Sequence, residues 1–560
     1  MIRGSPDHPA PFLGRYFWEV PARLPASSAL GITLLPRLVS MRCRKTMQMR
    51  VGDKIRAGVA LWCLCLLVSV LSRAQQPAEQ PGAPQTQSAT QKDAGERPQT
   101  SQPGQASNPA TVNQAASGSA PPRLQDLYGP GEPDVAEPET MFPHFKDTRF
   151  WLSGQANFIF QTHPDFTAPY SGKNSLNPNY EKATSRVLTL YTGVRLNDST
   201  EILVDIEEAG GTALSAGLGA AGAPNLDIVR NPQLSKAPYV GRAMIDKVFA
   251  LSKDKVENDR SYLSLFDELP RRRLEIRFGK FSMPDFFDVN SAGSDTHFQF
   301  MNWSVDNNGA WDYAADTRGY TMGAVADYED RNWGFRFAEA LMPEVANGDT
   351  LVWRPWQVHA EDWEYELRHG LISKKSGVVR LLAYTNYANM GIYRDQVALA
   401  EQDHVAPEIT DHPWHITRKY GFGANIEQNL TQYITAFARW GWDNGKTESF
   451  AYTEIDSTVE EGVGVNGAKW RRKQDRTGVV FVSNGIKKDH QIYLADRGYG
   501  FLIGDGKLNY GRENILETFY TAHVWRGIYV APGAQYIVDP GYNRDRGPVV
   551  VGSCRAHVEF

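Results

Sequence analysis

The chain has 560 residues, a formal net charge of -5, and 49 glycines, 24 tyrosines, 25 phenylalanines and 14 tryptophans. With 22% charged residues and a mean hydropathy of -0.44, it is too polar for a helical membrane protein. It has no concentrated basic stripe, so the composition does not indicate a nucleic-acid-binding protein. What remains is a chain rich in turn residues and aromatic rings.

The first continuous apolar run, AGVALWCLCLLVSVL at 57–71, predicts a secretory signal peptide. Basic residues precede the run, which is too short to span a bilayer comfortably, and the small residues Ser72 and Ala74 fit cleavage after Ala74. We therefore predict a signal peptide at 47–74. Residues 1–46 are interpreted as a gene-model extension, with a genuine cytoplasmic extension as the alternative.

The segment that follows the predicted cleavage site, 75–122, has a low-complexity composition. It is rich in Gln, Pro, Ala, Ser and Thr and has almost no large apolar residues. Such a segment buries too little surface to offset the entropy of ordering, so we predict a disordered linker. Residues 123–147 carry a Pro/Gly pattern typical of an irregular lead-in. One cysteine, Cys554, follows the cleavage site, so we expect no internal disulfide.

From residue 148 onward, alternation of apolar and polar residues with a period of two replaces this pattern. In 150–161, FWLSGQANFIFQ, the large apolar side chains fall on one face and Ser, Gln and Asn on the other. The alternation recurs in 186–196, 201–207 and 274–280, where Lys280 is placed on the polar face, and again in the last residues before Phe560. A period of two predicts β-strands with one apolar side.

Arginines on the polar faces favour a transmembrane barrel over a soluble sandwich. Against lipid, an Arg costs roughly 2–4 kcal/mol at the midplane, so Arg195, Arg277 and Arg439 indicate a watery lumen. Only a closed barrel satisfies every backbone group in a bilayer, so we predict that the strand ending at Phe560 pairs with the first strand. At roughly 26 residues per strand and connection, 148–560 accommodates an all-β, antiparallel barrel of about 16 strands.

Several long stretches carry a resemblance to a known family. They are PYSGKNSL (169–176), EEAGG (207–211), GKFSMPDFFDVN (279–290), FMNWSVDNNGAWDYAADTRGYTMGAV (300–325), GFLIGDGKLNYGRENILETFY (500–520) and YNRDRGPVVVGSCRAHVEF (542–560). Together they resemble the carbohydrate-selective outer-membrane porin family (OprB-type) over essentially all of 150–560. The resemblance implies a sixteen-stranded barrel in the outer membrane of a Gram-negative-type bacterium, passing sugars by diffusion. The Gln/Pro-rich linker departs from the family.

A sugar-selective channel needs side chains that match the chemistry of its solute. A sugar presents hydroxyl groups around a weakly apolar ring, so donors, carboxylate acceptors and aromatic platforms should line the lumen. The candidate donors are Arg195, Arg277, Arg336 and Arg439, the candidate acceptors are Asp205, Glu207 and Glu275, and the candidate stacking residue is Tyr191. The alternative is that these charges only neutralise one another along a wet wall.

A second group of candidates lies in the densest matching block, in a predicted loop. These residues are the aromatics Trp303, Trp311 and Tyr313, with Asp312, Asp316 and Arg318. They form either an inward-folded constriction or a packed loop that braces the wall, and the sequence leaves both open.

Three motif-like patterns are interpreted as incidental. GLGAAG at 217–222 matches a dinucleotide-binding pattern, but no βαβ unit surrounds it, so we expect a loop. The segment beginning at Asp288 starts like a calcium loop but has Gln299 at its twelfth position. His412 and His415 lack a third ligand. We therefore expect no catalytic residues, no metal and no cofactor.

The predicted function is passive diffusion of glucose and similar mono- or small oligosaccharides across a bacterial outer membrane. The expected partners are carbohydrates, outer-membrane lipid and, through the strand ending at Phe560, the barrel-assembly machinery; no nucleic acid is expected, and a homotrimer stays open. A non-selective porin and a structural anchor are alternatives. A barrel enzyme is a further one, but it would need a Ser nucleophile and a His base that no motif identifies.

Overall fold

The computed structural model describes residues 138–145, 148–228, 237–372, 375–450 and 452–560. The predicted gene-model extension, signal peptide and linker, and most of the lead-in, lie outside the described residues. All described residues belong to the compact unit 114–560. Within them, no helix combines the length and apolarity that crossing a membrane would require.

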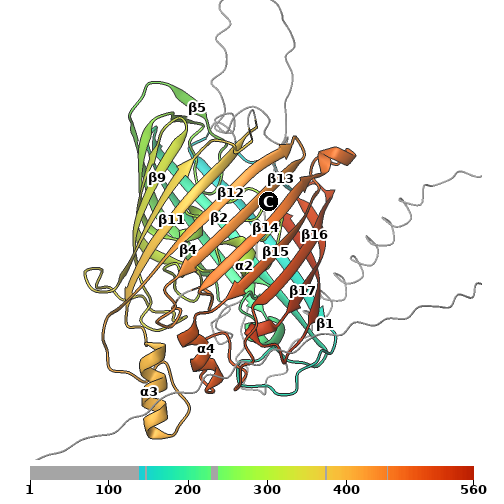
Figure 1. The fold of residues 1–560 in the computed structure, drawn as a ribbon. Coiled ribbons are helices and arrows are strands. Elements are labelled where there is room, and N and C mark those ends of the chain that lie inside the picture. The colour runs from blue at the N-terminus through green and yellow to red at the C-terminus, as the bar shows by residue number, and fades with distance from the viewer. Residues whose placement is uncertain (1–137, 146–147, 229–236, 373–374, 451) are drawn as a thin grey trace, which may run out of the picture. The chain divides into compact units, whose positions relative to one another are not determined.

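The described part of the chain forms one closed antiparallel barrel of 16 strands (Figure 1). In chain order the strands are β1 (Phe150–His163), β2 (Glu181–Asn197), β3 (Thr200–Gly211), β4 (Tyr239–Ala250), β7 (Arg273–Phe281), β8 (Thr321–Glu329), β9 (Trp333–Leu341), β10 (His359–Leu367), β11 (Gly377–Ala388), β12 (Thr417–Thr431), β13 (Ile434–Asp443), β14 (Ser457–Asn466), β15 (Arg476–Gly485), β16 (Glu513–Trp525), β17 (Ile528–Val538) and β18 (Val549–Glu559). The predicted fold class is confirmed.

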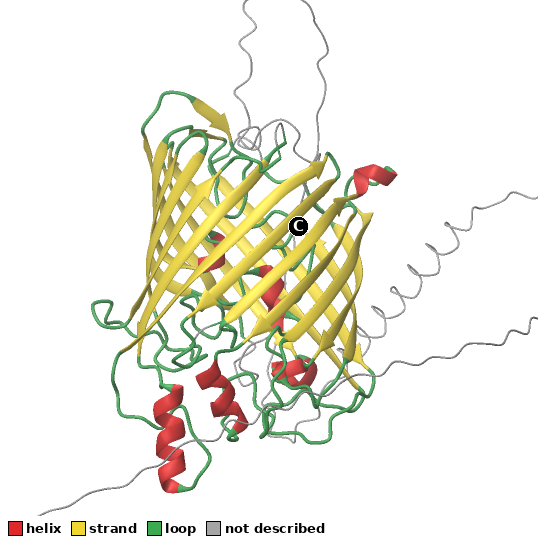
Figure 2. Cartoon of the chain, in the orientation of Figure 1, coloured by secondary structure: helices red, strands yellow, loops and turns green. Residues whose placement is uncertain are grey.

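Short elements lie in the connections between the barrel strands (Figure 2). They are the hairpin strands β5 (Lys255–Glu257) and β6 (Glu268–Pro270), the helices α2 (Trp303–Asp306), α3 (Tyr393–Asp403) and α4 (Lys488–Ala495), and the 3-10 turns η2 (Leu214–Gly217), η3 (Leu226–Ile228), η4 (Met283–Asp285), η5 (Gly467–Trp470) and η6 (Pro540–Tyr542). Helix α2 lies inside the barrel, whereas α3 and α4 project from one end.

The first and last strands close the barrel, as predicted. β1 pairs with β18 from Gln155 opposite Glu559 to Thr162 opposite Gly552. The backbone N–H of Phe560 continues this ladder by donating to the carbonyl of Gly154 at 2.7 Å. The last residue is therefore held by the first strand, and no open sheet edge remains between β1 and β18.

The two faces of the strands agree with the predicted alternation, except at Lys280. On β1, Phe150 and Phe158 are exposed on the outside, whereas Gln155 and Asn157 are buried inside. β7 pairs with both neighbours without a bulge through Gly279, so the pleat continues and places Lys280 on the face of Phe278. By register the placement of Lys280 on the polar face was therefore wrong, although its ammonium group reaches Asp316 of the connection 282–320 at 3.7 Å.

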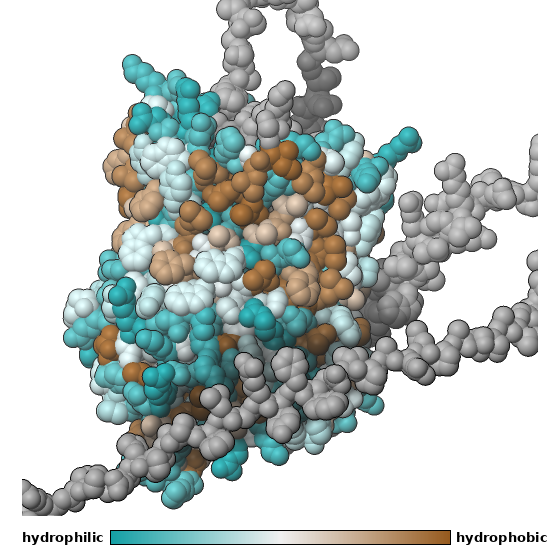
Figure 3. Space-filling view, viewed as in Figure 1, coloured by the Kyte–Doolittle hydropathy of each residue, from teal (hydrophilic) through white to brown (hydrophobic). Residues whose placement is uncertain are grey.

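The outer wall has the properties of a surface that contacts lipid. Apolar side chains form a broad band across the wall, with hydrophilic surface on either side of it (Figure 3). Trp333 stacks on Tyr365 and lies tilted against Tyr328 at one end of the strands, and Trp442 lies beside Tyr420 and Phe422 near the other. An apolar band between two aromatic girdles is typical of transmembrane barrels.

The two ends of the barrel differ in the length of their connections. At the short-turn end the strands are joined by turns such as 198–199, 330–332, 432–433 and 526–527, with 251–272 as a longer exception. The long-loop end carries 164–180, 212–238, 282–320, 342–358, 389–416, 444–456, 486–512 and 539–548. Two of these loops fold back into the barrel, through residues 212–228 and 282–320, and define its interior.

Candidate functional site

The connection between β7 and β8, residues 282–320, crosses the inside of the barrel, and we call it the lumen loop. Its backbone N–H at Asp288 donates to Glu364 on β10 at 2.7 Å. Further along, the N–H of Met301 donates to Glu517 on β16 at 2.7 Å, and the carbonyl of Gln299 accepts from Arg555 on β18 at 3.1 Å. The loop therefore spans from β10 to β18 and narrows the lumen.

Arg439 on β13 is the main cationic anchor of the lumen loop. Its guanidinium lies 2.9 Å from the carboxylate of Asp288 in the loop and 3.0 Å from that of Glu460 on β14. It also donates to the carbonyl of Val305 and to the hydroxyl of Ser294, both at 2.6 Å. Arg439 lies on the inner wall, but its side chain has 0% exposure because the loop covers it.

The lumen loop lies directly on the backbone of the wall at two glycines. A Cβ atom at Gly441 would lie 1.9 Å from the side-chain oxygen of Asn308, and one at Gly423 would lie 2.5 Å from its nitrogen. Asn308 uses this close approach to donate to the carbonyl of Trp440 at 2.9 Å. Larger residues at these two positions would displace the loop.

The connection between β3 and β4 supplies a second inward loop through its described residues 212–228. Glu513 on β16 accepts hydrogen bonds from the backbone N–H groups of Ala221, Gly222 and Gly541 at 3.0, 2.7 and 2.7 Å. GLGAAG is thus part of a packed loop inside the barrel. Neither Glu513 nor Glu517 was a sequence candidate, because alternation shows that they point inward but not which backbone groups they meet.

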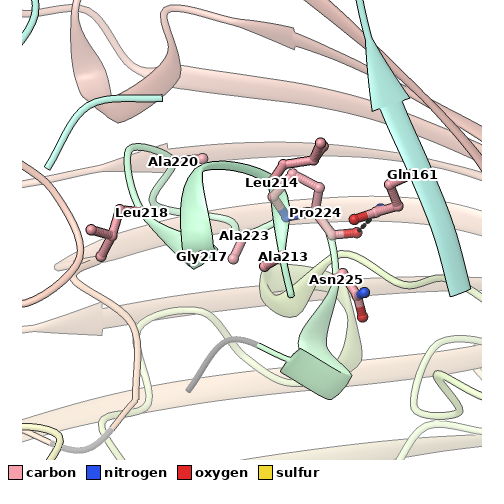
Figure 4. A pocket seen from close by; sticks show the side chains of 9 residues that line it. All are labelled: Gln161, Ala213, Leu214, Gly217, Leu218, Ala220, Ala223, Pro224 and Asn225. Atoms are coloured by element: carbon pink, nitrogen blue, oxygen red, sulfur yellow. Dashed lines mark hydrogen bonds between the residues drawn. The ribbon is translucent and has the colours of Figure 1, made fainter. Parts of the chain in front are cut away.

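The second inward loop packs tightly against the wall. Gln161 on β1 donates to the carbonyl of Pro224 at 2.9 Å (Figure 4). The cavity beside this contact, between the loop residues Leu214 and Ala223, has a volume of about 10 Å³. That is about the space of one water molecule, so this cavity cannot hold a sugar.

On the wall formed by β4 and β7 to β12, many of the inward charges form one network of ion pairs. Arg277 contacts Glu275 and lies 3.4 Å from both Asp246 and Asp327. Arg336 lies within 2.8 to 3.1 Å of Asp327, Glu329, Glu364 and Glu366. The network continues through Arg368 and Arg380 to Glu427. The predicted donors Arg277 and Arg336 and the acceptor Glu275 therefore neutralise one another, and their contact with a solute stays a prediction.

The remaining wall candidates lie on β2 and β3. Arg195 lies at the short-turn end, 2.6 Å from Asp267, away from the network. Asp205 accepts from Arg242 at 2.9 Å and Glu207 accepts from Tyr320 at 3.0 Å. The ring of Tyr191 stacks on Tyr262 with centroids 4.5 Å apart. Arg242 and Tyr262 were missed, and Tyr262 lies in a connection where no alternation marks it.

The loop candidates make bracing contacts. Trp303 packs edge-on against Tyr452, with ring centroids 4.8 Å apart. The indole N–H of Trp311 donates to Asp362 at 2.7 Å, and Asp312 accepts from the N–H groups of Phe450 and Tyr452. Asp316 accepts from the backbone of Arg318, whose guanidinium lies 3.9 Å from the ring centroid of Tyr239. These contacts fix the lumen loop, and a role in touching solute stays a prediction.

The long-loop end is covered by packed connections. His490 of α4 is buried and stacks on Tyr393 of α3 with ring centroids 4.2 Å apart. Glu454 accepts from the N–H groups of Leu502 and Ile503 at 2.7 and 2.9 Å, and burial raises the pKa of its carboxyl. Burial also raises the pKa of Glu448 in the same loop to about 8. The entrance at this end is therefore narrowed by ordered loops.

Several polar side chains inside the barrel remain open to water, and we call them the accessible lumen surface. They are Tyr262 with 36% exposure, and the side chains of Asp295 with 31%, His297 with 27%, Glu559 with 21% and Arg476 with 17%. Close contacts join this surface to the wall. His297 lies 3.3 Å from Gln155 on β1 and stacks on His557 of β18, which lies 2.9 Å from Glu559. The open part of the lumen thus runs past the tip of the lumen loop near β18, β1 and β2.

No metal site accompanies these features in the described part of the chain, where no three or more His, Cys, Asp or Glu side chains are grouped to hold an ion. The carboxylate of Asp288 is engaged by Arg439. The rings of His412 and His415 contact each other in the loop 389–416.

A closed barrel with an apolar outer band and a polar lumen narrowed by an inserted loop defines the class of protein as a porin. The family model described as "Carbohydrate-selective porin, OprB family" matches residues 173–560, and the chain belongs to this family. The family and the barrel imply a bacterial outer membrane and point to a channel rather than an enzyme.

One solved structure shows the same fold, and two further matches have lower TM-scores. A structure of Pseudomonas putida OprB at high pH is 14% identical, with a TM-score of 0.55, and the match covers 74% of this chain and 95% of that chain. A structure of the same protein at low pH is 12% identical, with a TM-score of 0.39 and coverage of 74% and 93%. The outer membrane channel DcaP of Acinetobacter baumannii is 10% identical, with a TM-score of 0.40 and coverage of 73% and 97%. No curated protein matches the chain.

Proposed function

We propose that this porin lets glucose and similar neutral mono- or small oligosaccharides diffuse passively across the outer membrane into the periplasm. The observation that carries the proposal is the mixed character of the accessible lumen surface. It combines carboxylates at Asp295 and Glu559 with a guanidinium at Arg476 and a phenol at Tyr262. A neutral solute with many hydroxyl groups can exchange hydrogen bonds with such a surface, whereas a wall of one charge sign would select ions.

The paired charges on the opposite wall support the same solute class. The guanidinium groups of Arg277 and Arg336 are each surrounded by carboxylates, so neither offers an uncompensated charge to an anion. The paired guanidinium and carboxylate groups can still donate hydrogen bonds to a sugar hydroxyl group and accept hydrogen bonds from it. The proposed direction of passage follows the usual orientation of such barrels, with the long-loop end outside the cell and the short-turn end in the periplasm.

Export through the predicted signal peptide and engagement of the assembly machinery by the strand ending at Phe560 stay predictions, as does a homotrimer. None of them is needed for diffusion through a single barrel. Each barrel encloses its own lumen.

Purified protein in planar bilayers tests the proposal. Stepwise ion currents should appear, and added glucose should reduce them in a saturable way, because a bound sugar occupies the narrow part of the lumen. Gluconate, of similar size but charged, is the matched solute and should be the weaker blocker. Equal, non-saturable effects of both solutes would identify the non-selective diffusion pore instead, and the absence of ion currents would contradict a pore altogether.

A further inference from the structure

We propose that Tyr262 is a stacking platform for the ring of a neutral pyranose sugar inside the lumen; this inference rests on the proposed function. The aromatic candidate from the sequence was Tyr191, which lies on the barrel wall. In the structure Tyr262 covers Tyr191, with the two rings 4.5 Å apart and inclined by 19°. Tyr191 is buried, whereas Tyr262 is 36% exposed, so Tyr262 presents the aromatic surface that water and solute can reach.

The connection 251–272 holds Tyr262 in this position from the short-turn end. Leu265 is fully buried, and its N–H donates to the inward carboxylate of Glu201 at 2.9 Å. Asp267 lies 2.6 Å from Arg195, and Arg260 lies 5.6 Å from the ring of Trp151. The segment around Tyr262 is thus tied to the inner wall on both sides, so little ordering remains to oppose solute binding.

Arg242 places a positive charge over the ring of Tyr262. Its guanidinium carbon lies 5.2 Å from the ring centroid of Tyr262. The guanidinium is fixed by Asp205 at 2.9 Å and by Asp285 of the lumen loop at 2.5 to 2.7 Å. The platform therefore lies next to the contact that Arg242 makes between the wall and the lumen loop.

The hydroxyl group of Tyr262 has no hydrogen-bond partner among the described residues. A tyrosine combines an apolar ring with a polar tip, which matches a pyranose whose C–H face is apolar and whose edge carries hydroxyl groups. Further partners follow along the wall. Tyr191 lies opposite Ser153 on β1, and Gln155, the next inward residue of that strand, contacts His297. A sugar that leaves Tyr262 can therefore exchange hydrogen bonds with the rest of the accessible lumen surface.

Glucose block of the ion current in planar bilayers, measured on the full-length exported protein, tests the platform. Tyr262→Ala should raise the glucose concentration for half-maximal block by about 2- to 10-fold, which corresponds to the usual strength of an aromatic contact. Tyr262→Phe keeps the ring and should stay within about 2-fold of wild type. Tyr536→Ala, which removes an exposed tyrosine on the lipid-facing side of β17, is the matched control and should leave the block unchanged.

Sorbitol distinguishes stacking from a general change in width, because this acyclic alcohol has no ring face. Tyr262→Ala should leave its weaker block unchanged. Equal loss of glucose and sorbitol block, an unchanged glucose block in Tyr262→Ala, or a Tyr262→Phe variant that behaves like Tyr262→Ala would each overturn the platform. If wild-type protein forms pores that glucose does not block at all, the proposed function itself fails.

Discussion

Replacing Arg439 by methionine should both destabilise the barrel and release the lumen loop from the wall. Methionine fills part of the same volume but leaves the buried carboxylates of Asp288 and Glu460 without their cation. Removing one partner of a buried ion pair typically lowers the free energy of unfolding by about 3–5 kcal/mol. Because Asp288 belongs to the lumen loop and Glu460 to the wall, the loss of Arg439 also removes a link between the loop and the wall.

Two readouts follow for Arg439→Met. The temperature at which the barrel unfolds, seen as a mobility change on a denaturing gel, should fall, and the single-channel conductance should rise because the lumen loop is loosened. Arg331→Met is the matched control, since Arg331 is exposed and lies 3.6 Å from Asp254 at the surface. Such a pair contributes about 0–1 kcal/mol to the free energy of unfolding.

Adding Glu460→Gln to Arg439→Met should recover part of the stability, because it removes one of the unpaired carboxylates. Wild-type unfolding temperature and conductance in Arg439→Met would contradict the role of Arg439 as the anchor of the lumen loop.

Replacing Glu513 by alanine should release the second inward loop. The carboxylate accepts three backbone N–H groups, at Ala221, Gly222 and Gly541, and lies fully buried. Each buried N–H left without an acceptor costs about 1–3 kcal/mol, so the free energy of unfolding should fall by at least about 3 kcal/mol. Limited proteolysis should then cleave within 212–228, and the unfolding temperature should drop.

The matched control is Glu461→Ala, which removes an exposed, outward-facing carboxylate from β14. Because a carboxylate on the lipid side is unfavourable, this variant should keep or raise the unfolding temperature. Equal stability of Glu513→Ala and wild type would show that the loop is held by other contacts.

The sequence allowed the barrel to be predicted because side-chain alternation follows directly from strand geometry. The faces of Phe158, Asn157 and Arg277 needed no knowledge of distant residues. Lys280 was misplaced because a glycine beside it suggested a break that the pairing does not contain. The pairing of β1 with β18 could be predicted because every strand edge in a membrane needs a hydrogen-bonding partner.

The interior could not be predicted in the same way, because it depends on contacts between segments far apart in the sequence. Arg277 and Arg439 both point inward by alternation, yet one belongs to an ion-pair network on the wall and the other lies under the lumen loop. Nothing local to Glu517 indicates that it accepts from Met301. Tyr262 was missed for the related reason that it lies in an irregular connection.

The central claim is that water and solute pass the tip of the lumen loop beside β18, β1 and β2. Its most direct test is the reaction of Asp295→Cys with a charged methanethiosulfonate reagent during single-channel recording, in a Cys554→Ala background. Asp295 is part of the accessible lumen surface, so the current should fall as the thiol is modified. Thr518→Cys on the outer face of β16 is the control and should give no change in current. An Asp295→Cys channel whose current is unaffected by the reagent would contradict the account.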